Sequence, residues 1–203
     1  MAYYVRVLGK SDINIHVNEL INDLKNKGLE AKFEIDPSEN LDNWTQLNVS
    51  NLDDDYLIQI ERNPIIDGEL GAEELIEFKE NIKDYKPVSA VKWLESYFNK
   101  IKVIYAFQLL NSSMEDDNFE IVDSIRDTIW KKVGGIMQAD DEGFSNEDGY
   151  HILWQFLDNA SGEFDMAVKN LFGKWINFRM NLGDKNQVNE FLSGKVPRKA
   201  LKL

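Results

Sequence analysis

The chain has 203 residues, of which 43% are hydrophobic and 29% are charged, and its formal net charge is −13 at pH 7. This makeup is typical of a globular protein with a sizeable core. The sequence contains no cysteine, which excludes disulfides, zinc–thiolate sites, iron–sulfur clusters and thiol nucleophiles.

The N-terminal half alternates strand and helix patterns. The predicted elements are a strand at 3–8, a helix capped by Ser11 or Asp12 and ended by Gly28, strands at 30–35, 44–49 and 55–62, a helix carrying Leu75, Phe78, Ile82 and Tyr85, and a helix that begins near Pro87. His16 lies at the border of the first helix's apolar stripe, where we expect no functional role.

From about residue 102 a similar order begins again. The predicted elements are a strand at 102–110, a helix opened by a capping box of Asp117 and Glu120 and ended by Gly134 and Gly135, strands at 136–140, 150–157, 164–171 and 174–182, and a helix at 186–193. We therefore expect an α+β protein with a mixed, mainly antiparallel sheet and packed helices.

The repeated order suggests two similar β-α-β-β-β halves, 1–101 and 102–197, although their sequences match poorly. A simple mixed sheet explains the same order. No linker-like segment separates the halves, so residues 1–203 are expected to form a single compact unit. Its last residues, 198–203, are expected to form a basic C-terminal tail.

An acidic segment at 138–156 is the most suggestive stretch for chemistry. Several neighbouring carboxylates favour a hard cation such as Mg²⁺, Mn²⁺ or Ca²⁺, as in a divalent-metal hydrolase. The candidate ligands are Asp140, Asp141, Glu142, Asp148 and His151. The spacing does not match a calcium-binding loop, however. The residues of "SNEDG" are of the types that favour a turn. A hairpin with a solvated acidic tip is the favoured interpretation, and His151 is then a hydrogen-bonded histidine on a half-exposed sheet.

Catalytic motifs are missing from the sequence. "LGKS" at 8–11 lacks the first glycine of a phosphate-binding loop, because Tyr4 stands at that position. Dinucleotide-binding, serine-hydrolase and zinc-protease motifs do not occur either. We therefore expect no cofactor and favour a non-enzymatic protein, although catalytic groups can converge from distant positions.

Charge and one amphipathic strand indicate binding instead. The net charge of −13 opposes nucleic-acid binding. Residues 115–165 hold fourteen acidic and three basic residues, whereas 166–203 hold eight basic and two acidic ones. These segments either neutralise each other within the fold or leave an acidic surface for a basic partner. The predicted binding residues are Asp116 and Asp117 on that surface and Trp175, Asn177 and Arg179 on the exposed strand face.

These patterns favour a protein-binding module that recognises a basic protein, in the general manner of toxin-neutralising immunity proteins or inhibitors. The alternatives are the metal-dependent hydrolase centred on residues 140–151 and a structural subunit of a homo-oligomer. The N-terminus lacks the layout of a signal peptide, and no stretch is long and apolar enough to span a bilayer. A cytoplasmic protein without a membrane partner is expected.

Overall fold

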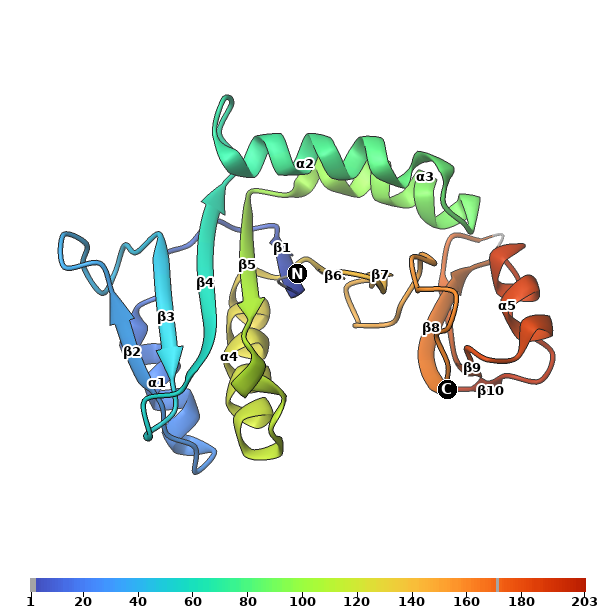
Figure 1. The fold of residues 1–203 in the computed structure, drawn as a ribbon. Coiled ribbons are helices and arrows are strands. Elements are labelled where there is room, and N and C mark those ends of the chain that lie inside the picture. The colour runs from blue at the N-terminus through green and yellow to red at the C-terminus, as the bar shows by residue number, and fades with distance from the viewer. Residues whose placement is uncertain (1–2, 171) are drawn as a thin grey trace. The chain divides into compact units, whose positions relative to one another are not determined.

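The structure is a computed structural model that describes residues 3–170 and 172–203, with the side chain of Asp116 outside the description. Within these residues, five α-helices combine with antiparallel strand pairs, so the predicted α+β fold class is confirmed (Figure 1). The chain divides into two compact units that alternate along the sequence. Unit 1 contains residues 1–73 and 101–135, and unit 2 contains residues 74–100 and 136–203.

Unit 1 is built on antiparallel strands that lie in the order β2-β3-β4-β5-β1. Strand β5 has a continuous apolar run, and its residues from Val103 to Phe107 are at most 5% exposed. Helices α1 and α4 pack against each other, and α4 also contacts β1 and β4. The elements are β1 (Tyr3–Gly9), α1 (Val17–Asn26), β2 (Lys32–Ile35), β3 (Gln46–Ser50), β4 (Tyr56–Pro64), β5 (Val103–Leu109), η3 (Asn111–Met114) and α4 (Asp116–Val133).

Unit 2 combines two helices, a hairpin and a second sheet in the order β10-β9-β8. Its C-terminal core packs α5 against this sheet around Met166, Phe178 and Phe191, which are fully buried. The elements are η1 (Ile82–Asp84), α3 (Val88–Tyr97), η2 (Phe98–Lys100), β6 (Ile136–Ala139), β7 (Gly143–Phe144), β8 (Glu163–Lys169), β9 (Trp175–Asn181), α5 (Lys185–Leu192) and β10 (Leu201–Lys202). Helix α2 (Leu70–Asn81) begins in unit 1 and continues into unit 2.

The first helix begins later than predicted, because its N-cap is His16 and not Ser11 or Asp12. The Asn18 N–H donates to His16 Nδ1 at 3.0 Å, and Glu19 Oε1 accepts from the His16 N–H at 3.1 Å. This reciprocal pair satisfies two N–H groups that the helix itself leaves without partners. The position of His16 in the sequence indicated no functional role and did not predict this structural role as a helix cap.

The C-terminal end of α4 comes close to the backbone of β1. The expectation that Gly134 and Gly135 end this helix is confirmed. A Cβ added to Gly135, whose φ is 104°, would lie 1.9 Å from the Leu8 carbonyl oxygen. Only glycine fits this approach without displacing the strand.

Two local predictions are wrong. Residues 150–157 do not form a strand, because only isolated bridges occur at His151 and Trp154. The N-cap of α4 is Glu115, without a side-chain cap, so the capping box of Asp117 and Glu120 is not formed.

The bounds of the two units differ from those of the expected halves, since unit 1 contains strands from both halves. The segment expected to be a tail at 198–203 contains β10, which pairs with β9.

Candidate functional site

The acidic segment forms two separate turns within unit 2. Strands β6 and β7 form a hairpin, and the turn between them contains Asp140, Asp141 and Glu142. Asp141 has a φ of 59°. The "SNEDG" run makes a second turn, in which Asn146 Oδ1 accepts from the N–H groups of Asp148 and Tyr150, both at 3.0 Å. The predicted hairpin, with "SNEDG" connecting strands at 136–140 and 150–157, is wrong, because β6 pairs with β7 and the turn between them lies earlier in the chain.

Of the five candidate metal ligands, Glu142 and His151 lie in contact with each other. Glu142 Oε2 lies 3.4 Å from His151 Nε2. The imidazole is enclosed by the rings of Phe156 and Phe164, at centroid distances of 5.5 and 4.8 Å. Within residues 3–170 and 172–203, no group of three or more histidine and carboxylate side chains is arranged to hold a metal ion.

The backbone around His151 explains why the predicted strand fails. The His151 N–H donates to the Asp165 carbonyl at 3.0 Å, and the Trp154 N–H donates to the Lys86 carbonyl at 2.9 Å. These partners come from different elements, so the segment has no continuous ladder. Ile152 and Leu153, next to His151, are both fully buried.

Trp175 belongs to an aromatic cluster of unit 2 rather than to an open strand face. Its ring meets that of Trp93 edge-on at 5.0 Å, and the amine of Lys169 lies 5.1 Å from its centroid. Trp93 in turn packs on Tyr97 at 4.6 Å. Such cation–π and aromatic contacts favour a defined ring orientation. Both tryptophans remain partly exposed.

The polar edge of this cluster is formed by Glu147, whose Oε1 accepts a hydrogen bond from the Tyr97 hydroxyl at 2.7 Å. Burial, reinforced by this carboxylate, raises the pKa of Tyr97. Burial together with the nearby Lys100 lowers the pKa of Lys169. Sequence reasoning missed Trp93, Tyr97 and Lys169. The spacing of Trp93 and Tyr97, four residues apart on one helix, was the available signal.

Arg179 and Asn177 lie farther along β9. Arg179 makes a bidentate contact with Asp165, its Nε and Nη2 lying 2.6 and 2.9 Å from the two carboxylate oxygens. This contact lowers the pKa of Asp165. Asn177 is partly exposed, and its Oδ1 is buried without a hydrogen-bond partner in the described part of the chain. Arg179 is exposed as predicted, but two of its donors are already used.

Unit 1 holds the predicted acidic residues Asp116 and Asp117 in the first turn of α4. Asp117 is exposed, whereas the side chain of Asp116 lies outside the described residues. The five predicted binding residues therefore belong to two units, with Trp175, Asn177 and Arg179 in unit 2.

Negative charge is concentrated in unit 1. This unit has 21 acidic and 10 basic residues, a net charge of −11, whereas unit 2 has 15 acidic and 13 basic residues, a net charge of −2. Within unit 1, residues 30–55 hold eight carboxylates and one cation, Lys32. The sequence expectation placed the acidic surface at 115–165, a range that crosses from one unit to the other.

No protein-family model matches the chain, and no curated protein or solved structure matches it. None of the described helices is long and apolar enough to cross a membrane. The fold assigns the chain to the α+β class.

Proposed function

We propose that this protein is a non-enzymatic binding module that recognises a basic protein partner through the acidic surface of unit 1. The observation that carries the proposal is the uneven partition of charge, −11 on unit 1 against −2 on unit 2. Self-repulsion among like charges works against a compact fold, so this excess is not explained by folding.

An acidic surface of this kind acts mainly on the rate of encounter. A potential of one sign attracts a partner of the opposite sign and raises the association rate constant. Salt screens this attraction between charges that are more than about 8 Å apart at physiological ionic strength. Glu30, Asp53 and Asp117 are exposed carboxylates on three different segments of unit 1, which makes them suitable probes of this surface.

The test uses the full chain as bait in a lysate of the source cells, followed by binding kinetics on each enriched protein. We expect a stoichiometric partner with a basic isoelectric point, whose association slows markedly as salt is raised to physiological strength while dissociation changes less. The triple variant Glu30→Gln, Asp53→Asn and Asp117→Asn should slow association.

The matched control removes the same number of exposed carboxylates from unit 2, through Asp148→Asn, Asp158→Asn and Glu163→Gln. If both triple variants slow association equally, net charge matters and the surface of unit 1 does not. That result would overturn the proposal, and so would failure to recover a basic partner, self-association as the only interaction, or turnover of a phosphoester with Mn²⁺.

A further inference from the structure

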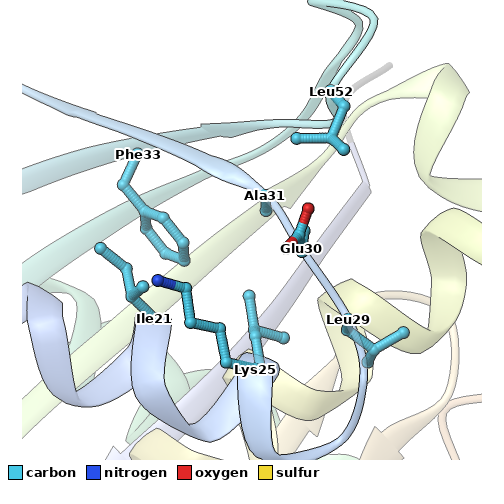
Figure 2. Close-up of a pocket in the computed structure, with 8 residues that line it drawn as sticks. Ile21, Lys25, Leu29, Glu30, Ala31, Phe33 and Leu52 are labelled. Atoms are coloured by element: carbon cyan, nitrogen blue, oxygen red, sulfur yellow. The ribbon is translucent and has the colours of Figure 1, made fainter.

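Unit 1 contains a pocket beside its outermost strand, lined by six apolar residues and two charged ones. The pocket has a volume of about 260 Å³ and opens between α1, β2 and the β3–β4 connection (Figure 2). Figure 2 shows Phe33 and Ile21 pointing toward each other in it, with Leu52 on the opposite side of the Ala31 backbone. The residues that line it are Ile21, Leu24, Lys25, Leu29, Glu30, Ala31, Phe33 and Leu52.

The size of the pocket favours a single side chain. Pockets for small-molecule ligands usually measure about 300–1,000 Å³ and enclose most of the ligand. This pocket is smaller, and it is open, since Leu52 is 55% exposed. Its size suits one large apolar side chain of a partner whose backbone binds outside the pocket.

Strand β2 offers a place to hold such a chain. Among the strands of the described residues, β2 ends the order of unit 1 and pairs with β3 alone. An edge strand presents backbone N–H and C=O groups along its outer side, and an extended peptide can pair with them. Phe33 lies on β2 itself and Ala31 immediately before it, so a peptide added beside β2 would pass the pocket.

Charge indicates the composition of the peptide. The only cation in residues 30–55 is Lys32, and its Nζ lies 2.5 Å from Asp54 Oδ1. Seven carboxylates besides Asp54 remain in this range. Among the described residues that line the pocket, Lys25 is the one cation and Glu30 the one carboxylate. A peptide beside β2 therefore meets a negative field, which favours lysine or arginine around its apolar residue.

We propose that β2 and this pocket bind an extended basic segment of a partner protein, which adds a strand to the sheet and inserts one large apolar side chain. This inference rests on the proposed function, because it assigns the acidic surface a specific docking mode. The partner's backbone would form hydrogen bonds with β2, and its apolar side chain would anchor it in the pocket. The flanking cations would raise the association rate constant.

The experiment titrates the full chain with a synthetic peptide of alternating threonine and lysine that carries one central phenylalanine. Binding is followed by the backbone amide signals of β2. We expect these signals to shift and their hydrogen exchange to slow. Replacing the central phenylalanine by alanine should weaken binding at least about tenfold, the effect of losing an anchor residue. N-methylation of the peptide backbone should abolish it.

Variants of the protein separate the pocket from the charge. Leu52→Ser and the pocket-filling Ala31→Trp should each weaken binding about tenfold or more. Leu41→Ser is the matched control for Leu52→Ser, since Leu41 is an exposed leucine of unit 1 that does not line the pocket. It should bind as wild type does. Thermal melts establish that each variant is folded.

Failure of the docking mode and failure of the proposed function give different results. If the phenylalanine and alanine peptides bind equally and Leu52→Ser has no effect, the docking mode is wrong, while salt-dependent capture of a basic partner would still support the acidic surface. If neither peptide binds, or if N-acetylphenylalanine amide competes as well as the peptide, the docking mode is also wrong.

Discussion

Gly135 lies so close to Leu8 that a Cβ at this position would come within 1.9 Å of the Leu8 carbonyl oxygen. The contact joins the end of α4 to β1, two elements distant in the sequence of unit 1. Close approach of two backbones also explains why the residue after Gly134 is another glycine, with a φ of 104°.

The first prediction follows from this contact. Gly135→Ala should lower the free energy of unfolding by about 3 kcal/mol or more, because it combines a backbone clash with an unfavourable φ. Gly28→Ala is the matched control: its φ is 75°, and no atom lies within 4 Å of the added Cβ. It should cost about 1–2 kcal/mol. Chemical denaturation measures both, and equal losses would contradict the contact.

The second prediction concerns the cap of α1. His16→Ala should destabilise the protein by about 1 kcal/mol, because the Asn18 N–H loses its acceptor. His16→Ser should restore most of this stability, since a serine hydroxyl caps a helix through the same kind of bond. Urea denaturation of the three proteins measures the difference. A serine variant no more stable than the alanine variant would argue against a capping role.

The third prediction concerns acid stability. Asp23 bridges α1 and α4, accepting hydrogen bonds from Lys27 Nζ and Thr128 Oγ1, both at 2.6 Å. These contacts, led by Lys27, lower the pKa of Asp23 below 3.8. A lowered pKa stabilises the fold above the unfolded value, and the contribution is lost as the pH falls through the folded value. Asp23→Asn should therefore be less stable than wild type at pH 7, by about 1 kcal/mol.

The two proteins should approach each other in stability as the pH falls below the unfolded aspartate value of about 3.9 and the wild-type carboxylate becomes protonated. Unfolding free energies at several pH values test this expectation. A difference that stays constant down to pH 2 would show that charge on Asp23 does not contribute.

The fourth prediction concerns alkaline stability. Burial raises the pKa of Tyr105 to about 12 and also raises that of Tyr97. A raised tyrosine pKa stabilises the fold below the unfolded value of about 10, and this contribution is lost as the pH rises toward the folded value. Tyr97 and Tyr105 should therefore ionise above the ordinary tyrosine value of about 10, which is seen as a delayed rise in phenolate absorbance. Tyr105→Phe should remove part of that delayed phase. Its persistence at full amplitude would show that Tyr105 titrates normally.

Regular elements were the part of the fold that sequence patterns predicted well. The apolar run of β5 and the spacing before Gly134 and Gly135 are local signals, and both elements formed. Residues 150–157 carry an equally convincing alternation, yet their backbone bonds go to Lys86 and Asp165. Those partners are tertiary, so no local pattern could distinguish this segment from a strand.

Candidate sites were harder to predict, for a related reason. Trp175 was recognised, but its neighbour Trp93 comes from a helix more than eighty residues earlier. The acidic surface was predicted by counting charges along the chain. Each unit, however, is assembled from two separate segments, so a continuous range such as 115–165 contains residues of both units. The pocket beside β2 joins residues from α1 and from the β3–β4 connection, which no sequence motif relates.

The alternation of the two units along the chain restricts how the protein can be divided. Each unit is assembled from two separate segments, with residues 74–100 of unit 2 standing between the two parts of unit 1. A single cut in the polypeptide therefore cannot yield both units intact. During synthesis, all residues of unit 1 are present once Gly135 has emerged from the ribosome. Unit 2 is complete only later, because the segment that carries α3 is made well before the C-terminal strands of the same unit.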